Sequence, residues 1–273
     1  MSIHTSTKVA YVQKPRHETT WSGGFLSPSC QAVAHDLKKK GYRVEGFTVE
    51  ELPPRNKVTP HTPVKGGAGC VKFLYERMFP GVIYPNIDIP TPLKKYARRK
   101  ITTSTLGEVC HNPRLPPNTF VKPLIHAKAF HGRTLDEIRF CGLLWRIPET
   151  LPVAVQEYRE FDDEIRYFVH PKGIRICPTD VIDLLDGEEP DATEVCLTKF
   201  AHKLVEEWKH KAPKAYVLDV GMSSKPNSTR RTPTLVEINS VLTCGNLENI
   251  RHPGDLVTTA WKSYARYGER GEF

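Results

Sequence analysis

The stretch "TLVEINS", residues 234–240, decides the fold of this chain. It predicts a β-strand, and its strand-forming apolar residues are Leu235, Val236 and Ile238. Because side chains alternate across a strand, Glu237 and Asn239 should share one face, together with Leu235. Val236 and Ile238 should lie on the other face and anchor the strand in the core. A carboxylate and an amide side by side on one strand call for a chemical reason.

The preceding segment "AYVLDVGM", residues 215–222, offers that reason, because it reads as a buried strand that carries Asp219. An unpaired buried carboxylate is costly. Two carboxylates and an amide oxygen on neighbouring strands suit a hard cation such as magnesium, which prefers oxygen ligands. The alternative is ordinary ion pairing, of Glu237 with Arg230 or Arg231 and of Asp219 with a lysine. The combination of the three groups favours the metal.

Length and composition place the chain among folded proteins. Its 273 residues suffice for one large or two modest domains, and 39% of them are hydrophobic, which argues against wholesale disorder. No apolar run is long enough to cross a membrane, and the N-terminus lacks the pattern of a secretory signal. We therefore expect a cytoplasmic protein without a membrane partner.

Cysteines and charge narrow the possible partners. The seven cysteines form no C-x-x-C pair, so reduced thiols are expected and a zinc site is not. The net charge of +8 is compatible with nucleic acid, with a phosphate site or with a solvated surface. Basic residues are dispersed apart from two short clusters at 94–100 and 209–214, so nucleic acid is possible but not favoured. A homodimer is a prior expectation only.

The N-terminal part predicts a small parallel α/β unit. A strand over 8–15 precedes a helix capped by Ser27 with Pro28 in its first turn, and a second strand follows from residue 42. The Pro- and Gly-rich segment 52–69 should be a loop before a helix over 70–79. Its "GGAG" lacks the spacing of a phosphate-binding motif, so a flexible turn is favoured.

The rest of the chain predicts a second α/β region. We expect a helix in the middle of 85–118 and a domain boundary near residue 112. Strands are expected at 119–124 and 153–161, with a hairpin over 164–182 that turns at 171–173. The clearest helix spans 192–211, because its apolar residues recur at helical spacing.

Several charged side chains accompany these strands. Lys122, within "TFVKPL", would suit a phosphate near the carboxylates, and Lys128 follows in a loop-like stretch. In "VQEYREFDDEIRYFV", Arg159 and Arg166 could clamp anionic groups, and the carboxylates could hold a heterocycle and its ribose. The alternative for the two lysines is an ordinary exposed position, and for the arginines and carboxylates it is surface ion pairing.

The order of these motifs resembles the ATP-grasp superfamily. V-K-P, E-Y-x(5)-E, an L-D strand and V-E-I-N follow one another, and the blocks "EYREF…EIRYFV", "YVLDVG" and "LVEINS" are most similar to the clade named for one arginine and two lysines. That clade is known largely from phage, viral and bacterial genomes. The similarity covers residues from about 94 to 245, and the N-terminal hundred residues resemble only a general α/β domain that precedes ATP-grasp domains.

The resemblance implies a role for each matching residue. Lys122 would bind the nucleotide phosphates, and Arg99 (with Arg98 or Lys100 as alternatives) would replace an earlier phosphate lysine. Glu157 and the backbone of Tyr158 would hold adenine, and Glu164 would hold the ribose. The second lysine would be Lys128, and the magnesium ligands would be Asp219, Glu237 and Asn239. Many peptide-forming members carry an arginine two residues before the metal aspartate, where this chain has Val217, so Arg99, Arg159 or Arg166 would stabilise the transition state.

The expected fold is therefore α/β (α+β), an ATP-grasp fold with an N-terminal Rossmann-like α/β domain. The domains would be 1–112 and 113–273, the latter divided into 113–155, with a lid at 125–134 that hinges at Gly132, and 156–273, with the nucleotide hinge and the metal site. The implied function is an ATP- and magnesium-dependent carboxylate–amine ligase that forms an acyl phosphate from small-molecule substrates. The alternative is a nucleic-acid-binding or macromolecule-modifying ATP-grasp protein whose acceptor is a modified base or a protein terminus; a kinase-like phosphoryl transferase is also conceivable.

Overall fold

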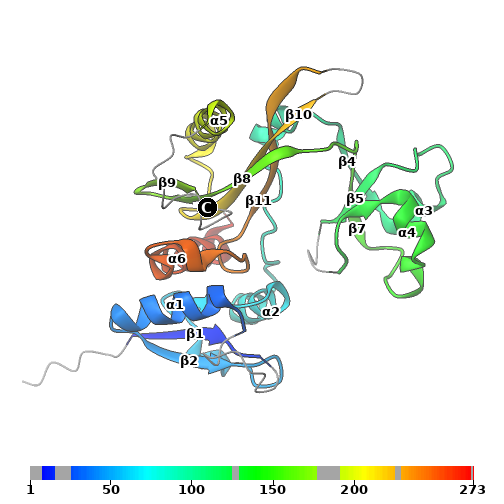
Figure 1. The fold of residues 1–273 in the computed structure, drawn as a ribbon. Helices are drawn as coiled ribbons and strands as arrows, with labels where there is room; N and C mark the ends of the chain where they lie inside the picture. The colour runs from blue at the N-terminus through cyan, green and yellow to red at the C-terminus, as the bar shows by residue number, and fades with distance from the viewer. Residues whose placement is uncertain (1–7, 16–25, 125–128, 177–190, 225–228, 272) are drawn as a thin grey trace, which may run out of the picture.

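The computed structural model describes residues 8–15, 26–124, 129–176, 191–224, 229–271 and 273. The described strands form three sheets, one in the N-terminal unit and two in the remainder of the chain (Figure 1). None of the described helices has the length and apolar character that a membrane crossing requires.

The N-terminal unit confirms the parallel α/β prediction. Its sheet has the order β2-β1-β3, with β1 (Val9–Gln13) parallel to β2 (Arg43–Phe47) and to β3 (Val64–Lys65). Helix α1 (Pro28–Lys39) begins as predicted, because the Ser27 side chain accepts a hydrogen bond from the Cys30 amide. Helix α2 (Ala68–Met78) matches the second predicted helix.

The predicted loop at 52–69 is wrong in one respect, because it contains β3 and a 3-10 turn, η1 (Arg55–Lys57). Two residues are too few for the alternation that announces a strand, so β3 gives no periodic signal. Lys65 in β3 is almost fully buried, and its ammonium group donates to the Val241 carbonyl at 3.4 Å and to the Cys244 carbonyl. Lys65 thereby ties the N-terminal sheet to the loop that follows β11.

The second sheet has the order β4-β7-β5-β6. Its strands and short helices are β4 (Ile101–Thr105), α3 (Leu106–His111), β5 (Phe120–Pro123), β6 (Arg133–Thr134), α4 (Leu135–Phe140), η3 (Leu143–Trp145) and β7 (Pro152–Gln156). A separate core of α3, α4 and these strands is centred on Leu106, Val121, Leu135 and Val153. This sheet begins earlier in the chain than the predicted boundary near residue 112.

The prediction of a helix in the middle of 85–118 was wrong in detail. That region forms a 3-10 segment, η2 (Thr91–Ala97), then the strand β4 and the one-and-a-half-turn helix α3. β4 is an edge strand of partly exposed polar residues, so it lacks the apolar alternation of a half-buried strand.

The third sheet has the order β11-β10-β8-β9 and carries the predicted hairpins. Its strands are β8 (Asp162–His170), β9 (Gly173–Ile176), β10 (Tyr216–Ser224) and β11 (Arg231–Asn239). The turn between β8 and β9 lies where it was predicted, with Gly173 at a φ of 127° that favours glycine. The remainder of the predicted 164–182 hairpin, from residue 177, lies outside the described residues.

Two long helices cover this third sheet (Figure 1). Helix α5 (Ala192–Trp208) packs on one face, where its apolar stripe meets Leu218 and Val220 of β10. Helix α6 (Pro253–Arg270) lies between α1 and the other face, and its Trp261 and Tyr264 share a core with Val217 and with the N-terminal unit. The C-terminal helix thus packs against the start of the chain, and η5 (Leu247–Asn249) packs beside it on α1.

Candidate active site

A row of three charged side chains crosses the third sheet. Arg166 on β8 is opposite Asp219 on β10, and Asp219 is opposite Glu237 on β11. The side-chain amide of Asn239 joins the two carboxylates, since its Nδ2 donates to Asp219 Oδ2 at 3.1 Å and to Glu237 Oε1 at 2.6 Å. The structure therefore brings together the three predicted metal ligands, and it places them on one face of the sheet.

A β-bulge in β11 changes the strand parity that regular alternation predicts. Asp219 is paired with Glu237 and Val220 with Leu235, so Val236 is the extra residue of the bulge. Leu235 and Ile238 consequently pack together in the core beneath α5, on the face opposite Glu237. The expectation that Leu235 shares the face of Glu237 was wrong, as was the pairing of Val236 with Ile238 as core anchors. Ile238 is buried, whereas Val236 is partly exposed.

Both carboxylates are paired with cations from other strands. Arg166 donates from Nε and Nη2 to the two oxygens of Asp219, at 2.8 and 2.9 Å, and only 1% of the Asp219 side chain is exposed. Lys122, on β5 of the second sheet, lies 3.2 Å from Glu237. The expected alternative of a lysine partner for Asp219 was wrong, because its partner is Arg166. Arg231, an alternative partner of Glu237, pairs with Asp162 and Asp163.

The charge pairs set the ionisation of this row. Burial raises the pKa of Asp219, against the opposing effect of the Arg166 guanidinium. Burial also opposes ionisation of Glu237, but Lys122, Asn239 and Arg166 together outweigh it and hold the pKa of Glu237 below its usual value. The hydrogen bonds to Asp219 raise the pKa of Arg166, so this guanidinium stays charged.

Asp88 is a further acidic member of the site, which the sequence reasoning did not identify. Its carboxylate forms an ion pair with Lys122, and its carbonyl accepts a hydrogen bond of 2.8 Å from the Ile238 amide. Asp88 has a φ of 46°, in the left-handed region that aspartate tolerates better than most residues. No pattern in the surrounding "PNIDIP" predicts the left-handed backbone of Asp88 or its contacts with distant residues.

The predicted adenine and ribose residues follow β7 and start β8. The Glu157 amide donates to the Lys100 carbonyl at 3.1 Å, the Glu157 carboxylate accepts from Arg159 at 2.7 Å, and Tyr158 is exposed. Glu164 is close enough to Asp219 and Glu237 that burial and these two negative charges raise its pKa, against the effect of Arg166. Of the predicted nucleotide residues, Glu164 thus lies beside the carboxylate row.

Arg159 lies beside Glu157, to which it donates a hydrogen bond. Its guanidinium also donates to the Ser224 carbonyl at 3.1 Å, and its buried Nε has no partner among the described groups. The side-chain nitrogen of Gln156, at the end of β7, is likewise buried without a partner in the described part of the chain. These are the kind of unsatisfied donors that a bound ligand can pair.

Arg99 has a set of contacts that its predicted phosphate role did not anticipate. It donates to Gln156 Oε1 at 2.8 Å and to the carbonyls of Leu235 and Val236 at 2.9 and 2.7 Å. Its guanidinium also lies 5.3 Å from the centre of the Phe161 ring. Burial lowers the pKa of Arg99. In this structure Arg99 connects the end of β7 to the bulge of β11, and its role toward phosphate stays a prediction.

A cavity of about 710 Å³ opens beside the carboxylate row. One wall contains Lys122, Arg166, Glu237 and Asn239, and the other walls come from the start of α2, from residues 83–88, from 129–132 and from the loop after β11. The cavity therefore lies where the N-terminal unit and both later sheets meet, as expected of a substrate pocket.

The predicted lid borders this cavity only in part. Lys128 and residues 125–127 lie outside the described residues, so Lys128 stays a prediction. Gly132, the predicted hinge, lines the cavity, and a Cβ there would lie 2.4 Å from the Phe120 ring. Its described role is thus to let the chain pass close to β5.

The donor set fits magnesium better than zinc. Among the described residues, no three His, Cys, Asp or Glu side chains form a metal cluster, and the candidate set is two carboxylates and an amide. Carboxylate oxygens suit magnesium, which completes its shell with water and phosphate oxygens. Asn239 would add its oxygen after rotation of its amide, because its nitrogen faces both carboxylates here.

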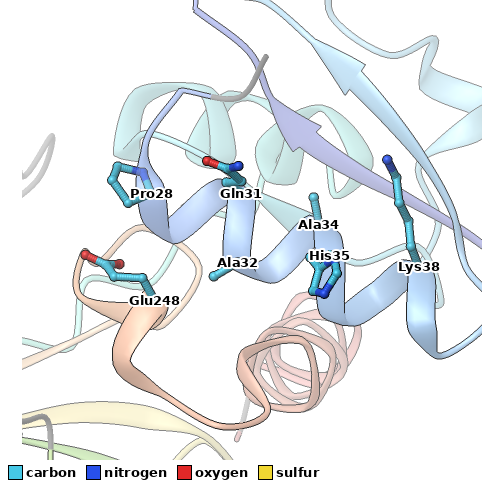
Figure 2. Close-up of a pocket in the computed structure, with 7 residues that line it drawn as sticks. All are labelled: Pro28, Gln31, Ala32, Ala34, His35, Lys38 and Glu248. Carbon is cyan, nitrogen blue, oxygen red and sulfur yellow. The ribbon is translucent and has the colours of Figure 1, made fainter. Parts of the chain in front are cut away.

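A second hollow, of about 480 Å³, runs along α1 (Figure 2). It is lined by residues of α1 and by Glu248 from η5, and its described lining differs throughout from that of the first cavity. Glu248 is the one carboxylate among these lining residues, so the chemistry is assigned to the first cavity, where cations and carboxylates are grouped.

The three-sheet architecture, the ordered strands and the acidic hairpin define an ATP-grasp protein. Residues 96–252, more than half of the chain, match the model of an ATP-grasp domain, that of family 2 in the clade named for one arginine and two lysines. The protein belongs to this family, as the sequence motifs predicted. Membership supports ATP binding and, in general, ATP-dependent ligase activity.

Solved structures resemble the chain at low identity. They include D-alanyl-alanine synthetase A from Vibrio cholerae (10% identity, 97% of this chain and 98% of that one, TM-score 0.49) and a RimK domain ATP-grasp protein from Sphaerobacter thermophilus (12%, 94% and 98%, TM-score 0.48). Another is the macrocyclase MdnC from Microcystis aeruginosa, solved with its precursor peptide MdnA (13%, 95% and 98%, TM-score 0.44). No curated protein sequence matches the chain.

Proposed function

We propose that the protein is a magnesium- and ATP-dependent carboxylate–amine ligase that forms an amide through an acyl phosphate. One observation carries the proposal: Asp219 and Glu237 lie on one sheet face, each paired with a cation, and Glu237 and both cations line a cavity of about 710 Å³. A structural ion pair needs no cavity beside it, whereas phosphoryl transfer needs acidic metal ligands, cations for the phosphates and room for a substrate.

Asp219, Glu237 and Asn239 would hold magnesium, which would neutralise phosphate charge and orient the transferred group. Lys122 and Arg166 now neutralise the two carboxylates. A divalent cation on these carboxylates would take over that task and leave both side chains available for phosphate oxygens. The pairing seen in the free protein is thus compatible with nucleotide binding.

The remaining residues would hold the nucleotide. Glu157 and the Tyr158 backbone would contact adenine, and Glu164 would accept hydrogen bonds from the ribose. The buried Nε of Arg159 has no partner among the described groups, which supports a role for Arg159 in binding an anionic group. Lys128 would be the second lysine toward the phosphates, and Arg99 would keep β7 and β11 in place.

The reaction would proceed in two balanced steps. A carboxylate oxygen of the acid attacks the γ-phosphorus of ATP, the bond to the β-γ bridging oxygen breaks, and ADP leaves. The amine nitrogen then attacks the acyl carbon, phosphate leaves, and the nitrogen loses a proton. Water must be excluded because acyl phosphates hydrolyse. Residues 129–132, which line the cavity beside β5, would cover it.

The test is ADP release from MgATP in the presence of amino acids and small amines. Asp219→Ala and Glu237→Ala should abolish the substrate-dependent release, while Asp136→Asn, at an exposed position at the start of α4, should retain it. Circular dichroism would verify that each variant is folded. Full activity in both folded alanine variants would refute the proposal.

A further inference from the structure

Asp88 has no place in nucleotide binding as described above, although it touches the phosphate lysine. Its carboxylate pairs with Lys122 Nζ, and 13% of the Asp88 side chain and 15% of the Lys122 side chain are exposed. If Lys122 turns to the phosphates, this largely buried carboxylate loses its cation, and an unpaired buried carboxylate is costly. A second cation must therefore accompany it when the nucleotide is bound.

The lining of the cavity limits what that cation can be. The described carboxylates in the lining are Asp88 and Glu237, and Glu237 already belongs to the candidate metal set. The other charged groups are Lys72, Lys122 and Arg166, all of them cations. Asp88 is therefore the one carboxylate in the described lining that lies outside the candidate metal set. It could pair with a positively charged group of a substrate when Lys122 turns to the phosphates.

The backbone fixes Asp88 in this position. Its main chain bridges to Ile238, between the two predicted metal ligands of β11, and its left-handed φ directs the chain into the site. The backbone of Asp88 is therefore fixed relative to β11, and its short side chain allows the carboxylate little movement. Lys122 has the longer and more flexible side chain of the pair.

We propose that Asp88 binds the ammonium group of the acceptor amine and takes the proton that this group must lose before its nitrogen can attack, and that in the free protein Lys122 occupies this acceptor site until nucleotide phosphates draw it away. This inference rests on the proposed function. It predicts an order of events: the amine cannot reach Asp88 before the nucleotide has engaged Lys122. Binding of the amine would thereby be limited to protein molecules that already hold ATP.

The first test measures affinity for the magnesium complex of AMP-PNP by calorimetry. Asp88→Asn tolerates the same left-handed backbone and removes the charge, so Lys122 is released in advance and binding should tighten roughly tenfold. Asp163→Asn is the matched control, because Asp163 also has a left-handed φ, of 48°, and pairs with Arg231 instead. Its affinity should equal that of the wild type.

A double variant separates release of Lys122 from general repulsion. If Asp88 acts by holding Lys122, the gain from Asp88→Asn should disappear in a Lys122→Gln background. If Asp88 only repels phosphate, the gain should persist. Persistence, or no gain in the single variant, would overturn the holding of Lys122 by Asp88.

The second test concerns the amine. Hydroxylamine is largely uncharged at pH 7.5 and can trap an acyl phosphate without an ammonium site, whereas L-alanine, L-lysine and methylamine offer ammonium groups. With a mixture of amino acids as the acid, Asp88→Asn should raise the KM of the cationic amines about tenfold and leave hydroxamate formation unchanged. An unchanged KM, or a wild type that forms hydroxamate yet uses none of these amines, would overturn the acceptor site. Absence of any hydroxamate would refute the proposed function instead, and calorimetry would still decide the role of Asp88 toward Lys122.

Discussion

Arg166 and Asp219 are directly opposite each other on β8 and β10, and the guanidinium of Arg166 donates two hydrogen bonds, of 2.8 and 2.9 Å, to the carboxylate of Asp219. Such a bidentate pair is among the stronger ionic contacts in proteins. Because Asp219 is almost fully buried, its charge depends on this partner in the absence of a metal. The pair supports the sheet and, by our proposal, the metal site.

Removal of Arg166 should destabilise the free protein. Arg166→Gln leaves a buried carboxylate without its main partner, and we expect the free energy of unfolding to fall by about 3 kcal/mol. Urea unfolding followed by circular dichroism measures this change. Lys209→Gln is the control, since the Lys209–Glu206 pair is exposed and should contribute little to stability. A loss below about 1 kcal/mol for Arg166→Gln would contradict the prediction.

Lys122→Gln should weaken nucleotide binding by a factor of about ten or more, because a charge-assisted contact to phosphate is lost. Calorimetry with MgADP gives the affinity directly. Lys95→Gln, which removes a cation paired with Glu207 outside the site, should bind as the wild type does. Equal affinities for both variants would show that Lys122 does not contact the nucleotide.

Arg99→Lys separates two roles for Arg99. Lysine keeps the charge but cannot reproduce the planar contacts to Gln156 and the two β11 carbonyls, so a connecting role predicts a loss of stability of about 2 kcal/mol. A purely phosphate-binding role predicts wild-type stability with altered nucleotide affinity. Urea unfolding and calorimetry on the same sample distinguish the two.

Glu164 gives a prediction about pH. Its pKa is raised in the folded protein, so its ionised form destabilises the fold. The stability tied to its neutral form is complete below the ordinary pKa of 4.5 and is lost as the pH rises through the raised value. Glu164→Gln should therefore unfold at higher urea than the wild type at pH 7.5, and this gain should vanish at pH values below 4.5.

The same variant should bind nucleotide more weakly if Glu164 accepts hydrogen bonds from the ribose hydroxyl groups. Glu160→Gln, at an exposed neighbouring position, serves as the control for both measurements and should change neither. Higher stability without weaker nucleotide binding would leave the electrostatic explanation standing and remove Glu164 from the ribose site.

The acidic hairpin could be predicted because its information is local. Apolar residues flank Asp219, two ligand types alternate in "VEIN", and few residues separate the strands, so antiparallel pairing follows from chain order alone. Helices α1 and α5 were predictable for a similar reason: a cap or an apolar stripe lies within each segment.

The bulge at Val236 was not predictable in this way. It is defined by which residue of β10 opposes which residue of β11, and a sequence carries no such register. The strand β4 did carry a weak signal, because Thr102, Thr103 and Thr105 are β-branched residues that suit a strand. Its polar, exposed faces gave no alternation to support that signal.

Asp88 is the clearest example of a site residue that could not be predicted from the sequence. Its importance comes from three long-range contacts, to Lys122, to Ile238 and to the cavity, and none of these is encoded near residue 88. A loop aspartate among prolines has no periodicity and no motif. Only the folded arrangement of the linker, β5 and β11 gives it a chemical setting.

The bulge also has a mechanical consequence. Arg99 donates hydrogen bonds to the carbonyls of Leu235 and Val236 on β11, the strand of Glu237. It also donates to Gln156 at the end of β7, which the predicted adenine residues follow. A rotation of one sheet against the other must stretch or break these bonds, or displace β11 itself. If the sheets close around a nucleotide, as the proposed function implies, that movement and the spacing of Asp219, Glu237 and Asn239 would therefore be coupled through Arg99.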